Sequence, residues 1–156
     1  MKNVLTGGIV FLTDYASKRW AERHLKKGEK HDKVRGYVSL ERMTNTGMSA
    51  GRYPDTNDRT ALIHGAALIL ALVRCLYLAL KKTGKLARFG YALILGGGLG
   101  NLNDRLTREG VTDFIRLPKA PGKHKTMVFN IADVAITVGA VIAVIGELVR
   151  ACSKKK

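Results

Sequence analysis

The amino-acid sequence predicts a mainly α-helical membrane protein, a bundle of four transmembrane helices with a small extramembrane β-sheet and loop. Charged residues gather into a few stretches, and long apolar runs lie between them. Residues 61–80 form one such run, and as a helix it would be about 30 Å long, which is one hydrocarbon thickness. Residues 34–43 alternate loosely and contain β-forming residues, which predicts a short strand. We expect residues 1–156 to form one domain.

The first apolar run, residues 4–20, is predicted to be a membrane helix with a polar second half. It follows Lys2 and has a short apolar centre, as a signal peptide does. However, Asp14, Lys18 and Arg19 interrupt the run, and no small-x-small cleavage pattern follows it. These features favour a membrane helix over a cleaved leader.

Three further helices are predicted over residues 61–80, 86–102 and 127–149. The run 86–102 contains four glycines in the five residues 96–100. Small residues allow helices to approach closely in a bilayer, so this segment predicts tight helix packing. The polar region between the first two helices, about residues 23–59, contains the predicted strand and, from Asn45 onward, turns and loop.

The basic composition and the Cys and His content exclude several classes of protein. The formal net charge of +15 would suit a nucleic-acid binder. Such a binder needs no apolar run of membrane-spanning length, whereas anionic lipid headgroups also attract basic segments. Cys75 and Cys152 lie in unlike surroundings, and the four histidines form no pair at helical spacing. We therefore expect membrane lipids as partners, and no nucleic acid, disulfide, metal or cofactor.

Charge bias does not determine the orientation of the bundle. Four spans place both termini on the side of the basic turn around residues 81–88, and the positive-inside rule would make the more basic side cytoplasmic. That side carries nine Lys and Arg residues, whereas the two opposite loops carry nine and six. The count therefore points away from a cytoplasmic location of the termini.

Two acidic residues near one end of the fourth predicted helix suggest catalysis. Asp133 lies inside the apolar run 127–149, three residues after Asn130, and Asp113 is flanked by apolar residues. An acid within a membrane span is costly and indicates function. Two carboxylates that share one proton can act as base and acid. Alternatively, Asp133 satisfies free amides at a helix N-terminus, and Asp113 is a loop acid paired with Arg105 or Arg116.

Five sequence blocks resemble the signature of lipoprotein signal peptidases (signal peptidase II). The blocks are Asp14-Tyr-Ala-Ser-Lys18, Asn45-Thr-Gly47, Gly100-Asn-Leu-Asn-Asp-Arg-Leu106, Val111-Thr-Asp-Phe-Ile115 and Phe129-Asn-Ile-Ala-Asp-Val-Ala-Ile136. They are similar to the family's D-x-x-x-K, N-x-G, GN-x-x-DR, V-x-DF and FN-x-AD-x-x-I segments, in that order. The resemblance spans the whole chain.

The resemblance implies a role for each matching residue. Asp113 and Asp133 match the catalytic aspartates of an aspartic endopeptidase. The matching residues that bind substrate or support the site are Asn45, Asn101, Arg105, Asn130 and Asp14. Simpler roles stay open for some of them: Asn45 as a turn residue, Asp14 as the partner of Lys18, and Arg105 as an interfacial anchor.

The resemblance also implies a substrate and a location. Family members are bacterial and remove signal peptides from diacylglyceryl-modified prolipoproteins, on the N-terminal side of the lipidated cysteine. They are multi-pass proteins of the cytoplasmic (inner) membrane, with the active site near the extracytoplasmic face, and cyclic peptides inhibit them. They also carry a small β-cradle outside the membrane, which the strand at 34–43 would fit.

The segment after Asn45 departs from the family pattern. The family's N-x-G-A-A-F block reads Asn45-Thr-Gly-Met-Ser-Ala-Gly51 here, without its aromatic residue. This difference concerns substrate access rather than the acidic pair. Two alternatives therefore stay open: a divergent family member that cuts another membrane peptide, and a non-enzymatic four-span binding or transport protein.

Overall fold

The computed structural model describes residues 2–46, 57–108, 110–122 and 126–153. It confirms the mainly helical architecture with a small antiparallel sheet. In chain order the elements are α1 (Lys2–His24), β1 (Lys30–Lys33), η1 (Val34–Gly36), β2 (Val38–Asn45), α2 (Asn57–Leu80), α3 (Lys85–Thr107), β3 (Val111–Arg116), β4 (Val128–Phe129) and α4 (Ile131–Ser153).

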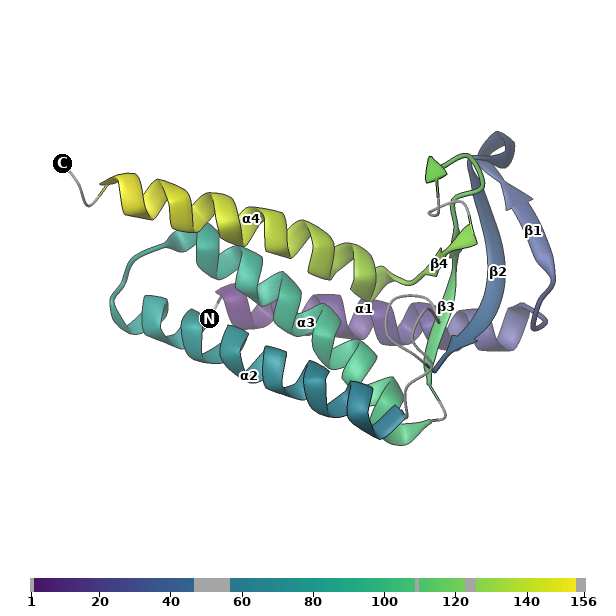
Figure 1. The fold of residues 1–156 in the computed structure, drawn as a ribbon, viewed down its shortest axis with the longest axis horizontal. Helices are drawn as coiled ribbons and strands as arrows, with labels where there is room; N and C mark the ends of the chain where they lie inside the picture. The colour runs from purple at the N-terminus through teal and green to yellow at the C-terminus, as the bar shows by residue number, and fades with distance from the viewer. Residues whose placement is uncertain (1, 47–56, 109, 123–125, 154–156) are drawn as a thin grey trace.

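Helix α3 is the central element of the bundle. It packs against α1, α2 and α4, and Figure 1 shows α2 and α4 running along opposite sides of it. A Cβ added at Gly90 would overlap the backbone of α4 at Ala143, and one added at Gly96 would overlap the backbone of α1 at Gly7. The glycines of α3 therefore allow both neighbours to approach, as the sequence predicted.

The sheet lies at the end of the bundle where α4 begins (Figure 1). Its strand order is β1-β2-β3-β4, and all neighbours are antiparallel. The strand predicted at residues 34–43 is wrong at its start. Residues Val34–Gly36 form a 3-10 turn in which Arg35 and Gly36 have positive φ, so the strand begins only at Val38. It also continues through Asn45, which was expected in a turn and pairs with Val111 of β3.

The fourth predicted helix begins four residues too early. Val128 and Phe129 pair with β3 as a short strand, so α4 begins at Ile131. Asp133 therefore lies in the first turn of this helix rather than seven residues inside it. In contrast, α3 continues past residue 102 to Thr107, which places Asp104 and Arg105 on its last turns.

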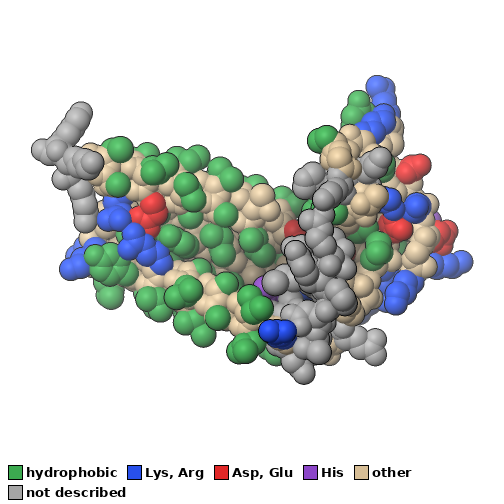
Figure 2. Space-filling view, in the orientation of Figure 1, with side chains coloured by type: hydrophobic (Ala, Val, Ile, Leu, Met, Phe, Trp, Pro, Cys, Tyr) green, Lys and Arg blue, Asp and Glu red, His purple; other side chains and the backbone are tan. Residues whose placement is uncertain are grey.

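Two of the helices are long and apolar enough to cross a membrane. Within the described residues these are Ala61–Leu80 of α2 and Ile131–Ser153 of α4, by length and composition. Most of their side chains point outward, and Figure 2 shows hydrophobic side chains along this surface. An apolar surface of this kind suits lipid rather than water. The sequence predicted four spans, but only two of the described helices are apolar enough by composition, because α1 and α3 carry more polar residues.

Candidate active site

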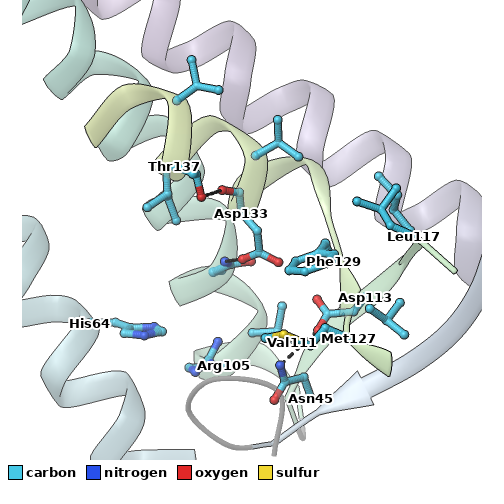
Figure 3. A pocket seen from close by; sticks show the side chains of 16 residues that line it. Asn45, His64, Arg105, Val111, Asp113, Leu117, Met127, Phe129, Asp133 and Thr137 are labelled. Carbon is cyan, nitrogen blue, oxygen red and sulfur yellow. Dashed lines mark hydrogen bonds between the residues drawn. The ribbon is translucent and has the colours of Figure 1, made fainter. Parts of the chain in front are cut away.

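Asp113 and Asp133 reach one cavity from different elements. Asp113 lies on β3 and Asp133 in the first turn of α4, and both line a cavity of about 610 Å³ (Figure 3). Asn45, Asn101 and Arg105 line the same cavity. The structure therefore brings together residues that lie as far apart as positions 45 and 133 in the sequence.

The carboxylate of Asp113 is buried and held by two amide side chains. Its Oδ2 accepts a hydrogen bond from Asn45 Nδ2 at 3.0 Å, and its Oδ1 accepts one from Asn130 Nδ2 at 2.6 Å. Burial, and then the nearby charge of Asp133, raise the pKa of Asp113 to about 7, while the two amide bonds act in the opposite direction. Asp113 therefore changes protonation state near neutral pH.

The carboxylate of Asp133 lies in a capping arrangement at the start of α4. Its Oδ2 accepts the backbone N–H of Asn130 at 3.1 Å, and its own backbone N–H donates to Asn130 Oδ1 at 2.9 Å. Its Oδ1 accepts a hydrogen bond from Asn101 Nδ2 at 2.9 Å. Asp133 thus caps the N-terminus of α4, as considered from the sequence, and it also lines the cavity.

Asn130 connects the two carboxylates. It is fully buried between β4 and α4, and it contacts Asp113 through its side chain and Asp133 through its backbone. Its Nδ2 also donates to Asn101 Oδ1 at 3.1 Å. One residue therefore holds both carboxylates, one through its side chain and the other through its backbone N–H. The alternative partner considered for Asp113, Arg116, forms an ion pair with Glu41 instead.

A buried ionic cluster behind the cavity includes Lys18 and Asp104, neither of which was predicted as a site residue. Lys18 Nζ lies 2.7 Å from Asp14 Oδ2, 3.1 Å from Asp104 Oδ2 and 2.8 Å from Asn101 Oδ1. The pairing of Asp14 with Lys18 considered from the sequence is therefore present. A charged pair at i and i+4 within an otherwise apolar helix was the available signal for Lys18.

The two acids of this cluster hold the backbone next to each candidate catalytic residue. Asp14 Oδ1 accepts the backbone N–H of Ala132, the residue before Asp133, at 2.8 Å. Asp104 Oδ2 accepts the backbone N–H of Thr112, the residue before Asp113, at 3.3 Å. Lys18 thus pairs with both carboxylates that hold the backbone of β3 and α4, and Arg108 adds a second positive charge beside Asp104, at 3.1 Å.

His64 is a further residue of the cavity that sequence reasoning missed. It extends from α2 toward the cavity, on the side of Arg105 (Figure 3). No other histidine lies at helical spacing from it, so the sequence offered no pattern that singled it out. Within the described part of the chain, no group of three or more His, Cys, Asp or Glu side chains could hold a metal ion.

The fold and the cavity together indicate a membrane protein in which two carboxylates, the buried Asp113 and the partly exposed Asp133, line one cavity. The family model for signal peptidase (SPase) II matches residues 7–149, and the chain belongs to this family of proteases. The lipoprotein signal peptidase of Rhodopseudomonas palustris (strain TIE-1) is 33% identical over 155 residues, covering 97% of this chain and 94% of that protein. The lipoprotein signal peptidase of Dichelobacter nodosus (strain VCS1703A) is 37% identical, covering 90% and 89%.

Solved structures share the same fold. One, described as a bacterial membrane enzyme solved at 2.3 Å by the in meso method, has a TM-score of 0.80 and 23% identity, covering 99% of this chain and 92% of that chain. A second, at 1.9 Å, has a TM-score of 0.76 and the same identity, covering 94% and 92%. This likeness concerns the fold of the bundle and sheet.

Proposed function

We propose that this protein is an aspartic endopeptidase that removes signal peptides from diacylglyceryl-modified prolipoproteins, on the N-terminal side of the lipidated cysteine. The observation that carries the proposal is the pair Asp113 and Asp133, which share one cavity and are tied to each other by Asn130. Membership of the signal peptidase II family supports the substrate class.

The two acids divide the proton transfers of peptide hydrolysis. Because the pKa of Asp113 is raised to about 7, its acid form is available near neutral pH, and we assign Asp113 as the acid and Asp133 as the base of a pair that shares one proton. Asp133 removes a proton from water as the water oxygen attacks the scissile carbonyl carbon, and Asp113 gives its proton to the carbonyl oxygen. The tetrahedral diol then collapses: the C–N bond breaks, the amine leaves with the proton that Asp133 had taken, and one hydroxyl of the diol returns its proton to Asp113 as the new C=O bond forms.

The amide side chains around the pair hold the reacting groups in place. Asn45 and Asn130 donate to Asp113, while Asn101 donates to Asp133, so each carboxylate has a fixed orientation toward the cavity. Arg105 lines the same cavity, and its positive charge favours the negative charge that develops on the carbonyl oxygen in the transition state, before the proton transfer from Asp113 is complete. Fixed orientation of this kind can lower a barrier by several kcal/mol, of the roughly 7–11 kcal/mol that proximity supplies at most.

The lipid on the substrate cysteine anchors the scissile bond at the membrane surface. Each methylene of a diacylglyceryl chain that enters the bilayer contributes about 0.8 kcal/mol of anchoring. The cavity lies where apolar helix α4 meets the sheet, so a peptide held by its lipid reaches the acids directly. In the family orientation this end faces the outside of the bacterial cytoplasmic membrane.

The test is cleavage of a diacylglyceryl-cysteine precursor by purified protein in detergent. Asp113→Asn and Asp133→Asn should each nearly abolish cleavage, since each carboxylate has a separate proton to move. Asp32→Asn, on exposed β1, is the matched control and should cleave at the wild-type rate. A rate above roughly a tenth of wild type, about 1.4 kcal/mol of barrier, in either variant would show that the residue is not catalytic.

The substrate class has its own test. The unlipidated precursor should be cut far more slowly than the lipidated one, because it lacks the anchor. Cyclic peptide inhibitors of the family should block cleavage, whereas serine and cysteine reagents should not, since the nucleophile is water. Equal rates for both precursors would remove the lipoprotein assignment and leave a membrane aspartic peptidase of another specificity.

A further inference from the structure

A second cavity lies between α2 and α4, toward the end of the bundle away from the candidate active site. Its floor is α3, at Tyr91 and Ile94, and its volume is about 580 Å³. The remaining residues that line it are Arg74, Ala140, Ala143, Val144, Glu147, Leu148, Arg150 and Ala151. We call this cavity the α2–α4 groove. Most of its wall is apolar, and charged side chains occupy only one part of it.

One carboxylate holds two arginines in the groove. Glu147 accepts hydrogen bonds from Arg74 Nε at 2.7 Å, from Arg74 Nη2 at 2.8 Å and from Arg150 Nε at 2.9 Å. Two guanidinium groups would otherwise repel each other, so Glu147 is what keeps them together. Tyr91 Oη also donates to Glu147, at 3.4 Å, from the floor of the groove. The arrangement joins all three helices.

The charge of this cluster is unbalanced. Two arginines and one glutamate leave a net charge of +1, and Arg74 lies within the apolar span Ala61–Leu80. A charge at such a position is costly unless it is neutralised. A single phosphodiester carries the one negative charge that would complete the balance.

The surroundings add positive charge. The turn between α2 and α3 carries the exposed side chains of Lys81 and Lys82. Arg150 is adjacent to this turn, since its Cδ lies 3.5 Å from the position of a Cβ built at Gly84. Figure 2 shows charged side chains gathered at this end of the bundle, next to hydrophobic surface. A cationic ligand would be repelled here, whereas an anionic headgroup is attracted.

We propose that the α2–α4 groove binds one anionic phospholipid. Its phosphate lies against the guanidinium groups of Arg74 and Arg150, and an acyl chain follows the apolar wall formed by Ile94, Val144 and Leu148 toward the bilayer centre. Charge-assisted hydrogen bonds from guanidinium groups suit phosphate oxygens. The site is separate from the acidic pair, so it does not depend on the proposed peptidase function.

The experiment measures lipid binding to purified, delipidated protein by native mass spectrometry. Phosphatidylglycerol should bind at least about tenfold more tightly than phosphatidylcholine, which is 1.4 kcal/mol. Arg150→Gln and Arg74→Gln should each reduce this preference to about threefold or less. Lys85→Gln removes a charge from the same end of the bundle but outside the groove, and it should keep the preference. Melting of each variant in phosphatidylcholine reports whether it is folded.

Three results would overturn the proposal. Equal affinity of the wild-type protein for both lipids would show that the groove does not select charge. An equal loss of preference in Lys85→Gln and Arg150→Gln would show diffuse attraction rather than a site. Glycerophosphoglycerol, which has the headgroup without acyl chains, should not compete with phosphatidylglycerol at equal concentration. Full competition would exclude the role of the apolar wall.

Discussion

At the scale of single residues, the buried cation Lys18 organises the centre of the molecule. It is 1% exposed and contacts Asp14, Asp104 and Asn101, each of which in turn contacts a group at or beside the acidic pair. A buried charge that loses its partner is strongly destabilising. The stability of this centre and the geometry of the pair therefore depend on the same side chain.

Replacing Lys18 should destabilise the protein. Lys18→Met leaves the carboxylates of Asp14 and Asp104 without this partner, and we expect a loss of about 3–5 kcal/mol. Melting in detergent measures the effect, and Lys33→Met on exposed β1 is the control, with little change expected. The double variant Lys18→Met/Asp14→Asn should recover part of the loss, because the amide needs no counter-charge. A double variant less stable than Lys18→Met would contradict this explanation.

The pH dependence of cleavage should follow Asp113. Its pKa in the folded protein is raised to about 7, above the usual value of about 3.9 for an aspartate. The acid form needed to protonate the carbonyl is present below that pH, so kcat/KM should fall as pH rises through about 7. The same raised pKa means that the free energy of unfolding of the wild-type protein should decrease as pH rises from about 4 to about 7, whereas Asp113→Asn should lack this contribution.

Asn45 offers a separate check on the assignment of this pKa. Its hydrogen bond favours the ionised form of Asp113 and so lowers the pKa. Asn45→Ala should therefore move the alkaline limb of the kcat/KM profile to higher pH. A limb that stays in place would assign the titration to a group other than Asp113.

At the scale of elements, the contact between α3 and α4 decides how the bundle closes. Gly90 of α3 faces Gly139 and Ala143 of α4, and the two backbones approach too closely for any side chain at position 90. This contact sets the position of α4 and hence of Asp133 in its first turn. The glycine pattern thus affects the candidate active site through helix packing.

A methyl group at this contact should weaken the bundle. Gly90→Ala would overlap the backbone of α4, and such overpacking costs about 1–3 kcal/mol. Gly65→Ala on α2 is the matched control, since its added Cβ would have no atom of another element within 4 Å. Alanine favours a helix by about 1 kcal/mol over glycine, so the control should melt at the same or higher temperature. Equal melting of both variants would contradict the close α3–α4 contact.

At the scale of the whole molecule, orientation in the membrane is the question that charge counting leaves open. The sheet and the acidic pair lie at one end of the bundle, and the α2–α3 turn lies at the other (Figure 1). The proposed function requires the lipidated substrate to reach the acidic pair near the extracytoplasmic face of the membrane. We therefore expect the sheet to face outward and the α2–α3 turn to face the cytoplasm.

Thiol labelling in intact cells tests this orientation. In a Cys75→Ser/Cys152→Ser background, Lys33→Cys on β1 should react with an impermeant reagent, whereas Lys81→Cys should react only after permeabilisation. Both side chains are exposed, so shielding reflects the membrane rather than burial. The reverse pattern would place the acidic pair on the cytoplasmic side and contradict the lipoprotein assignment.

Most residues of the candidate site could be predicted from the sequence, but the contacts that hold them in place could not. Asp113, Asp133, Asn45, Asn101, Arg105, Asn130 and Asp14 were predicted as site residues. The structure places the first six at or beside one cavity and Asp14 in the buried cluster with Lys18, and their proposed roles stay predictions. Lys18, Asp104 and His64 were missed as site residues. The pair Asp14 and Lys18 at i and i+4 was a local signal for Lys18. Asp104 meets Lys18, and His64 reaches the cavity, only through packing between helices far apart in the sequence, which no local pattern reports.

The sequence by itself determined the long helices, the close packing of α3 and the family. Apolar length and glycine spacing are local features, and the five blocks are read directly from the chain. Only the tertiary structure decided that residues 128–129 pair with β3 as a strand. That pairing shortens α4 and brings Asn130 between the two acids. A strand of two residues is too short to show the two-residue alternation of a strand in its sequence. It forms only because a partner strand elsewhere in the chain supplies its hydrogen bonds.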